Sequence, residues 1–547
     1  MIFCIEIVFT LNTIGISPLF LVSSFSKPLN ETAMLVKTYG STVFGISATT
    51  ITIEVNLANG INFHLVGLPD NAVRESQQRI RAAFKNNDLH FPGKEITINL
   101  APADIRKEGS QFDLPIAIGV LAVAAQISCT ELDRFLLVGE LSLDGTLNPM
   151  SGVLPIALQA KKEGYLGVIL PKVNAEEAAI VEGIQVFGAS NLREVVDHLN
   201  EVQRMEPIVS PLQNGFDAVL NKSEVDFSEV KGQMNIKRAF EIAAAGGHNV
   251  ILIGPPGAGK SMLAKRLPTI LPPMSMDEAL ETTKIHSVAG KMKNGTSLIT
   301  QRPFRKPHHT ISDIALVGGG GYPQPGEISL AHNGVLFLDE LPEYKRTVLE
   351  VMRQPLEDRC VTISRAKFSI DYPAGFMLVA AMNPCPCGYY NHPEKECVCG
   401  PGIVQRYLNK ISGPLLDRID LHVEVTPVSF QELTSQAVSE SSAAIRKRVE
   451  VTRQVQRERY MEHAGMHCNA QMSAKDLKQH CSIDKQGHEM LETAMNRMGL
   501  SARAYDRILK VARTIADMDG HSSIALNHLA EAIQFRSLDR ESWSVPK

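Results

Sequence analysis

The sequence lacks an excess of charge of either sign. Its 55 lysine and arginine residues are balanced by 59 aspartate and glutamate residues, which gives a formal net charge of −4. Because the chain as a whole is not basic, any contact with nucleic acid has to be made by a local group of side chains. The sequence also has no internal repeat and no low-complexity tract, and its 547 residues are enough for about two or three domains.

The sequence is also poor in the features that indicate secretion. Nine cysteines in 547 residues do not resemble a disulfide framework. Residues 1–25 are apolar, but they lack a basic N-terminal region and contain Glu6 and Asn12. Met34 begins a segment that leads into an alternating strand pattern at 51–55. We therefore expect residues 1–33 to be a mis-assigned extension of a cytoplasmic protein without a membrane span, with a true membrane anchor as the alternative.

Residues 254–261 read Gly-x-x-x-x-Gly-Lys-Ser, directly after the apolar run 249–253 and before a helical pattern. A strand, a glycine-rich turn and a helix in this order are typical of a loop that binds nucleotide phosphates through backbone N–H groups and the helix N-terminus. We expect Lys260 to contact the β- and γ-phosphates and Ser261 to hold Mg²⁺. The predicted ATP-binding loop consists of Gly254, Pro255, Pro256, Gly257, Ala258, Gly259, Lys260 and Ser261.

Two further apolar runs end in polar residues that suit nucleotide hydrolysis. The run 335–338, typical of a strand buried in a parallel sheet, is followed by Asp339 and Glu340. Asp339 is expected to join Ser261 at Mg²⁺ and so to belong to the ATP site, while Glu340 is expected to polarise the attacking water. The run 376–382 ends at Asn383, whose amide can bond the water or the γ-phosphate. The sequence therefore predicts ATP hydrolysis.

Strand and helix patterns alternate in the first part of the chain. Strand-like runs at 49–57 and 95–100 are interspersed with helical patterns at 72–86 and 115–125, which favours an α/β fold. A stretch with Pro, Ser, Gly and Asn follows and is typical of a linker. The expected division is an α/β domain at 34–204, a linker at 205–227, a parallel-sheet ATPase core at 228–427 and a helical region at 428–547.

Longer motifs carry a resemblance to known ATPases. The segments 326–340, 381–384 and 413–420 together resemble the magnesium-chelatase-like branch of AAA+ ATPases. From Met34 onward the chain resembles the ComM/YifB family, whose pattern is also matched at 67–76 and 302–309. The resemblance implies a homohexameric ring with ATP sites between subunits. It also implies a DNA helicase that promotes branch migration in recombination and natural transformation, with recombination proteins among its potential partners.

The resemblance also implies roles for two arginines. Arg418 matches the position of an arginine that reaches the γ-phosphate of a neighbouring subunit, a task suited to its fixed charge. The alternative is a surface ion pair with Asp417 or Asp420. Arg503 matches a catalytic sensor arginine of a C-terminal helical lid, and Arg507, one helical turn later, is a possible substitute.

A hairpin expected at 361–370 carries the predicted DNA contacts. Related ring helicases place a basic residue on such a hairpin, and Arg365 and Lys367 fit that position. Contacts of this kind would go to phosphates with little sequence preference. The alternative is an exposed hairpin with ordinary solvated charges. A second basic cluster, to which we assign no metal, consists of Arg302, Arg305, Lys306, His308 and His309.

Four cysteines form two C-x-C pairs within the short segment 385–399. They are Cys385, Cys387, Cys397 and Cys399. Four thiolates at this spacing can surround one tetrahedral Zn²⁺ in a reducing compartment. Reduced structural cysteines or a redox pair are the alternatives.

Segments 139–149 and 168–174 resemble the proteolytic domain of Lon proteases, which has a ribosomal S5 domain 2-like fold and uses a serine nucleophile with a lysine base. Leu154 stands where the family lysine is expected, Asp113 lies near the nucleophile position, and Ser110 has no evident partner. We therefore expect an inactive Lon-like domain. An ATP-dependent peptidase remains an alternative function, as does a chelatase-type motor that drives metal insertion into a tetrapyrrole.

Overall fold

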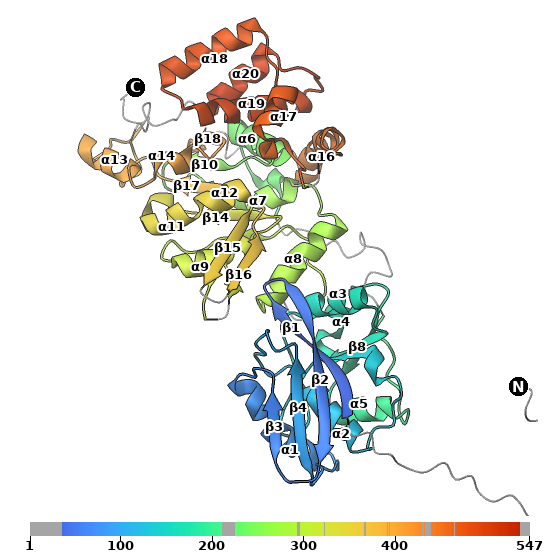
Figure 1. The fold of residues 1–547 in the computed structure, drawn as a ribbon. Coiled ribbons are helices and arrows are strands. Elements are labelled where there is room, and N and C mark those ends of the chain that lie inside the picture. The colour runs from blue at the N-terminus through green and yellow to red at the C-terminus, as the bar shows by residue number, and fades with distance from the viewer. Residues whose placement is uncertain are drawn as a thin grey trace, which may run out of the picture.

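The structure is a computed structural model that describes residues 35–209 and 225–536, apart from 293–295, 322, 366–367, 391, 393, 429–431, 433–438 and 464. The proposed extension 1–33 and residues 210–224 of the expected linker lie outside the described residues. Figure 1 shows an N-terminal sheet in blue and teal, a second sheet in green to orange, and a group of C-terminal helices in red beyond it.

The N-terminal sheet has seven strands in the order β3-β4-β2-β1-β5-β8-β9. The pairs β1–β2 and β2–β4 are antiparallel, and the remaining pairs are parallel. The strands are β1 (Leu35–Phe44), β2 (Ser47–Ala58), β3 (Phe63–Val66), β4 (Glu95–Ala101), β5 (Phe135–Leu137), β8 (Gly167–Pro171) and β9 (Gln185–Ala189), and a small ribbon pairs β6 (Glu140–Leu141) with β7 (Leu147–Asn148).

Helices cover both faces of this sheet. One apolar core includes buried residues of α1 (Asn71–Asn86), α2 (Asp113–Val123) and α5 (Leu192–Leu199). The other includes buried residues of α3 (Val153–Glu163) and α4 (Ala175–Ala178). The expectation of an α/β fold with alternating strands and helices is confirmed. Within a strand, alternate residues such as Ile51, Ile53 and Val55 point to one face of the sheet and are buried in the core there.

The second sheet has five strands in the order β11-β14-β17-β10-β18, all of them parallel. They are β10 (Val250–Ile253), β11 (Phe304–Arg305), β14 (Val335–Leu338), β17 (Met377–Met382) and β18 (Leu421–Glu424). The predicted parallel-sheet core is therefore confirmed. Since the strands run in one direction, the residues that follow β10, β14 and β17 all lie at one edge of the sheet.

Alternate residues of these strands enter two cores on opposite faces. One core is shared with α6 (Met234–Gly246), α7 (Lys260–Ile270), α16 (Ser442–Arg459), α17 (Ala474–His480), α18 (Lys485–Met498), α19 (Ala502–Met518) and α20 (Leu526–Gln534). The other is shared with α9 (Asp313–Val317), α10 (Glu327–Leu330), α11 (Arg346–Val351), α12 (Arg353–Asp358), α13 (Pro401–Leu408), α14 (Gly413–Leu416) and the hairpin of β15 (Cys360–Arg365) and β16 (Phe368–Pro373). A short ribbon pairs β12 (Gly318–Gly319) with β13 (Gln324–Pro325).

The C-terminal helices are fixed to the sheet by polar contacts as well as by the shared core. Gln456 on α16 donates to the carbonyl oxygen of Ala245 on α6 at 3.1 Å. Arg507 on α19 forms a 3.1 Å ion pair with the buried Asp420, which directly precedes β18. These helices therefore pack as one body with the parallel sheet.

The two sheets are connected through α8 (Met276–Val288), which lies between them in Figure 1. Gly152, at the start of α3, donates its backbone N–H to the carbonyl oxygen of Ser287 on α8 at 3.1 Å. Ile180 of the N-terminal part is buried together with Met274, just before α8, and Ala279 on α8. Within 35–209 and 225–536, no described helix is both long and apolar enough to cross a membrane.

Candidate active site

The loop 254–259 joins the buried strand β10 to the first residue of α7. Gly257 and Gly259 have φ values of +78° and +84°, a left-handed conformation that other residues adopt only at a cost. Gly259 caps α7, so Lys260 is its first residue. Backbone N–H groups in the first turn of a helix have no partner within that helix, and the helix dipole favours an anion there. The loop therefore has the backbone geometry that a phosphate group requires.

Lys260 bends back across the loop. Its Nζ donates to the carbonyl oxygens of Gly254 at 2.6 Å and Pro255 at 2.9 Å, and to Oδ1 of Asn383 at 3.0 Å. Burial lowers the pKa of Lys260 to about 8, against the opposing influence of the Asp339 and Glu340 carboxylates. Asn383 follows β17, the neighbour of β10. The lysine and the asparagine predicted from separate motifs therefore meet at the carboxyl edge of the sheet.

Ser261, the residue after Lys260 on α7, contacts Asp339, which directly follows β14. The Ser261 hydroxyl donates to Oδ2 of Asp339 at 2.7 Å, and the Lys306 ammonium donates to the same oxygen at 2.8 Å. Burial alone would raise the pKa of Asp339, but the bonds from Lys306 and Ser261 outweigh it and hold that pKa below its ordinary value. A hydroxyl and a carboxylate in contact are hard oxygen donors, so these two residues fit Mg²⁺.

Glu340 lies next to this pair with a more exposed side chain. Its φ is +53°, which is uncommon for a residue other than glycine and marks a locally constrained backbone. Oε2 of Glu340 lies 3.4 Å from Nδ1 of His309, and 58% of the side chain is accessible. A carboxylate that is exposed beside the phosphate loop can orient and polarise a water molecule.

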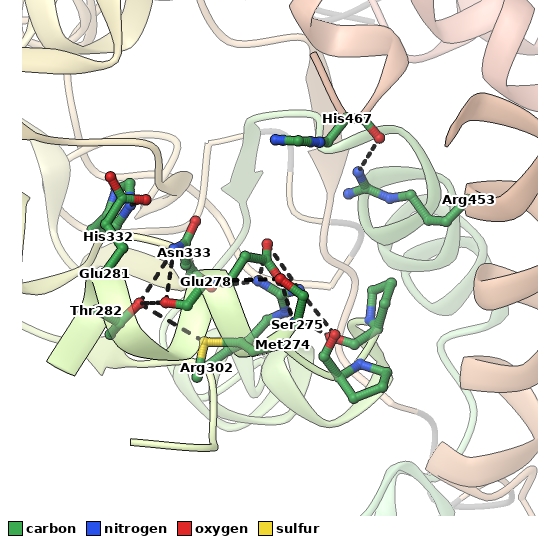
Figure 2. A network of polar contacts seen from close by, with 12 residues as sticks. Met274, Ser275, Glu278, Glu281, Thr282, Arg302, His332, Asn333, Arg453 and His467 are labelled. Carbon is green, nitrogen blue, oxygen red and sulfur yellow. Dashed lines mark hydrogen bonds and ion pairs between the residues drawn. The ribbon is translucent and has the colours of Figure 1, made fainter. Parts of the chain in front are cut away.

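From the sequence, Lys306 and His309 are grouped with other basic residues as a second basic cluster, and neither is predicted to belong to this site. The structure divides that cluster. Arg302 has a side chain that is 14% accessible and pairs with Glu278 at 3.0 Å (Figure 2), and Arg305 pairs with Glu327 at 2.6 Å. The segment reaches the acidic residues because β11 pairs in parallel with β14. A strand of two residues leaves no periodic pattern from which this pairing could be predicted.

Arg418 lies at the opposite edge of the sheet from the phosphate loop. Its carbonyl oxygen accepts from Nδ2 of Asn249, the residue before β10, at 3.2 Å. The phosphate loop follows the far end of that four-residue strand, roughly 16 Å away at the usual rise per residue. The guanidinium is buried and forms a 2.6 Å ion pair with Glu357 on α12. The partners considered from the sequence, Asp417 and Asp420, are therefore the wrong ones.

Arg503 and Arg507 lie near the same edge and differ in their engagement. Arg507 forms an ion pair with the buried Asp420. Arg503, at the start of α19, is exposed. The hydrogen bond from Arg418 holds the pKa of Glu357 below its ordinary value despite partial burial, and the charges of Arg503 and Arg507 act in the same direction. The charges of three arginines therefore act on one glutamate near the edge of the sheet opposite the ATP-binding loop.

The four predicted metal-binding cysteines come together. Their sulfur atoms all lie within 4.8 Å of one another. Sγ of Cys385 is 3.3 Å from that of Cys387 and 3.7 Å from that of Cys397. Burial would raise the pKa of the Cys387 thiol, but hydrogen bonds from the backbone of Tyr389 and Val398 and from the neighbouring thiols outweigh it and lower that pKa to about 6. Tetrahedral sulfurs at ordinary Zn–S distances are about 3.8 Å apart, so the cluster fits a zinc ion without rearrangement of its fold.

The cysteine cluster is also part of the wall of the ATP site. Gly388, within the cluster, has a φ of +85°, and a Cβ atom at that position would lie 2.4 Å from Cδ of Pro256 in the phosphate loop. On its other side the cluster continues directly from Asn383 through Pro384 to Cys385. The cysteine cluster therefore contacts the ATP-binding loop and is covalently continuous with the residue that bonds Lys260.

The hairpin expected from the sequence is present, whereas the predicted DNA contacts are only partly described. Strands β15 and β16 pair in antiparallel register from Cys360↔Pro373 to Arg365↔Phe368. Val361 and Ile363 are buried, while Thr362 and Ser364 face solvent. Lys367 and the side chain of Arg365 lie outside the described residues, so their role stays a prediction.

In the N-terminal part, no lysine occupies the position expected for a protease base. Leu154 is fully buried in α3. The hydroxyl of Ser110 donates to Oε2 of Glu140, so the serine does have a partner, and that partner is acidic. Asp113 is buried and held by Arg79 with bonds of 2.6 and 2.9 Å. Ser110 and Glu140 line a cavity of about 470 Å³ that reaches Val288 of the ATPase part.

Comparison with known proteins gives matches along most of the chain. The family model described as magnesium chelatase, subunit ChlI matches residues 226–433, its C-terminal counterpart matches 439–536, and subunit ChlI of Mg-chelatase matches 53–174. Lon protease 2 of Bacillus subtilis is 29% identical over 189 residues, which is 29% of this chain and 33% of that protein.

Several relatives match nearly end to end, among them the following two. Competence protein ComM of Haemophilus influenzae is 45% identical over 504 residues, which cover 92% of this chain and 97% of that protein. The uncharacterized protein YifB of Escherichia coli is 43% identical over 502 residues, which cover 91% and 96%. Identity at this level across almost the whole length, together with the family models, shows that the chain belongs to the ComM/YifB family of magnesium-chelatase-like AAA+ proteins.

Proposed function

We propose that this protein is an ATP-hydrolysing motor that acts on DNA and promotes branch migration during recombination or natural transformation. The observation that carries the proposal is the convergence of Lys260, Ser261, Asp339 and Asn383, with Glu340 beside them, at one edge of a parallel sheet. These residues have the chemistry needed to bind Mg²⁺·ATP and to orient the attacking water. The family suggests ATPase activity, and the name of the Haemophilus relative supports a link to competence.

The motor is proposed to be a homohexamer in the cytoplasm. Arg418 lies at the amino edge of the sheet and the phosphate loop at its carboxyl edge, so an arginine of one copy can serve only the site of another. Contacts between unlike faces of identical copies close into a ring when the rotation permits. The helices from α16 to α20 would serve as the lid, with Arg503 as its sensor residue.

Zn²⁺ is proposed as a structural ion at the four cysteines, which have the spacing and the sulfur chemistry that this metal prefers. When bound, it would hold the cysteine cluster in shape against the phosphate loop. Branched or single-stranded DNA is the proposed substrate, contacted through the β15–β16 hairpin at Arg365 and Lys367. The N-terminal part is proposed to be an inactive Lon-like domain that serves assembly or DNA engagement.

The test is the migration of a synthetic Holliday junction by the full-length protein with ATP and Mg²⁺. We expect ATP-dependent migration and an ATPase rate that rises with branched DNA. Lys260→Ala should abolish both, whereas Lys265→Ala, an exposed lysine on the same helix, should leave both intact. Stimulation by a partner subunit and not by DNA would favour the chelatase-type motor. Degradation of an unfolded substrate that requires ATP and Ser110 would favour the peptidase.

A further inference from the structure

A lysine occupies the place where the proposed Mg²⁺ site needs a cation. Oδ2 of Asp339 accepts hydrogen bonds from both the Ser261 hydroxyl, at 2.7 Å, and the Lys306 ammonium, at 2.8 Å. Ser261 and Asp339 are the two residues whose oxygens fit Mg²⁺. The positive charge of Lys306 therefore neutralises the carboxylate that the divalent ion would otherwise neutralise.

The backbone next to Lys306 is held by a buried hydrogen bond, whereas the side chain is long and partly exposed. The carbonyl oxygen of Pro307 accepts from the buried Tyr344 hydroxyl at 2.7 Å. Upstream, Arg305 pairs with Glu327, and Arg302 pairs with Glu278 on α8 (Figure 2). The Lys306 side chain is 43% accessible and has four rotatable carbons between its backbone and its charge. The ammonium can therefore leave Asp339 without any movement of the chain.

A divalent ion and an ammonium compete for one carboxylate oxygen, since each needs the same lone pairs and their like charges repel at short range. An ammonium already in place weakens the attraction of the site for a free divalent ion. A nucleotide that carries its own Mg²⁺ brings negative phosphate charge. This charge compensates for the lost contact between Lys306 and Asp339. The site then discriminates between free metal and metal–nucleotide complex.

We propose that Lys306 is a positioning residue that stands in for the divalent cation in the nucleotide-free protein and releases Asp339 when Mg²⁺ enters with the nucleotide. The inference rests on the proposed ATP site, because Ser261 and Asp339 are its metal ligands. It adds a residue that lies outside the phosphate loop and the acidic strand end. The Phe337 ring, whose centroid lies 5.2 Å from the Lys306 Nζ, borders the space in which the ammonium moves.

The test is a titration of the full-length protein with Mn²⁺ in the absence of nucleotide, followed by electron paramagnetic resonance of the free ion. Lys306→Met and Lys306→Gln should bind Mn²⁺ more tightly than the wild type, by roughly five-fold, the upper range for a partly exposed ion pair. Lys306→Arg, which keeps the charge, should stay close to the wild type. Lys410→Met is the matched control, because it removes a similarly exposed lysine. The Lys410 ammonium forms a 3.4 Å ion pair with Glu343, three residues after Glu340.

A second arm measures the Mg²⁺ concentration needed for half-maximal binding of a non-hydrolysable ATP analogue, which should fall in Lys306→Met and Lys306→Gln. Unchanged or weaker Mn²⁺ binding in both charge-removing variants, with native circular dichroism, would overturn the proposal. A wild type that binds no ATP analogue would instead contradict the proposed function. The two failures are distinguishable because the Mn²⁺ arm contains no nucleotide.

Discussion

Residues of the candidate active site have two different proposed roles: some supply charge to the phosphates, and others orient the attacking water. Lys260 is held by two carbonyl oxygens and Asn383, so its ammonium is already close to where phosphate oxygens would bind. Glu340 has a constrained backbone at φ +53° and an accessible carboxylate. Glu340 can therefore be altered with little effect on nucleotide binding, because, within the described residues, its side chain makes no contact that holds the ATP-binding loop in place.

Glu340→Gln should therefore keep ATP binding but lose turnover, by about 100-fold or more if the carboxylate acts as a general base. The amide has nearly the same shape but can neither accept a proton nor attract one from water. Steady-state phosphate release and the affinity for a fluorescent ATP analogue measure the two effects separately. Glu343→Gln, a half-exposed glutamate paired with Lys410, is the control and should behave as wild type. Normal turnover in Glu340→Gln would remove the assignment.

Asp420 illustrates a residue whose role is structural. It is fully buried, accepts the backbone N–H of Asn249 at 2.8 Å and pairs with Arg507. Burial alone would raise the pKa of Asp420, but Arg507 and His248 outweigh it and hold that pKa well below its ordinary value. A carboxyl with a depressed folded-state pKa stabilises the fold above its unfolded pKa of about 3.9. That stabilisation is complete above the unfolded pKa and is lost progressively as the pH falls from there to the folded value.

We expect Asp420→Asn to lower the free energy of unfolding by about 3–5 kcal/mol at neutral pH, because it leaves Arg507, whose side chain is only 18% accessible, without its counter-charge. The loss should shrink as the pH falls below about 4, where the wild-type carboxyl also begins to be protonated in the unfolded chain. Urea unfolding at pH 7 and pH 3 measures both. Asp417→Asn, the same change three residues earlier, should have little effect. Equal stability of wild type and Asp420→Asn at pH 7 would refute this account.

At the scale of elements, the sequence predicted what local patterns encode. Apolar runs followed by Gly254, Asp339 and Asn383 identified three parallel strands whose ends meet, because strand direction alone brings their carboxyl ends together. The two-residue strand β11 escaped prediction, and with it Lys306 and His309. Tertiary contacts between distant helices, such as Arg418 with Glu357, have no local signal either, which is why the partners expected from the sequence were wrong.

The cysteine cluster is an element whose effect should extend beyond its own segment. Purified protein should carry about one zinc ion per chain, held by thiolates. Removal of the metal, by a chelator or by Cys387→Ser with Cys397→Ser, should weaken ATP binding, because the cluster packs against Pro256 at Gly388. Elemental analysis and nucleotide affinity report the two effects.

Cys360→Ser provides the control for the cysteine cluster, since it alters a free cysteine on β15 outside it and should keep both zinc and ATP affinity. Native protein without zinc, and with four freely titratable thiols at 385, 387, 397 and 399, would contradict the metal site. Loss of zinc with unchanged ATP affinity would show that the cluster does not support the phosphate loop.

At the scale of the whole molecule, the length of the parallel strands separates the phosphate loop from Arg418. The phosphate loop lies at one edge, and Arg418 lies at the other beside Asn249. Within one chain the arginine cannot contact the nucleotide of that chain. The α12 helix supplies Glu357, which keeps the guanidinium folded against its own subunit. Use of Arg418 in catalysis therefore requires a second copy and the opening of this ion pair.

The mixing of two inactive variants tests this arrangement. Arg418→Ala keeps its own ATP site, and Lys260→Ala keeps the arginine. Each should be nearly inactive alone, while a 1:1 mixture should regain activity at about one quarter of its interfaces, those that join an intact loop to an intact arginine. Glu357→Gln should remain active, because it breaks the ion pair but keeps the guanidinium. If the two variants co-assemble and no mixing ratio restores ATPase activity, Arg418 does not act on a neighbouring subunit, and its buried contact with Glu357 is then its whole role.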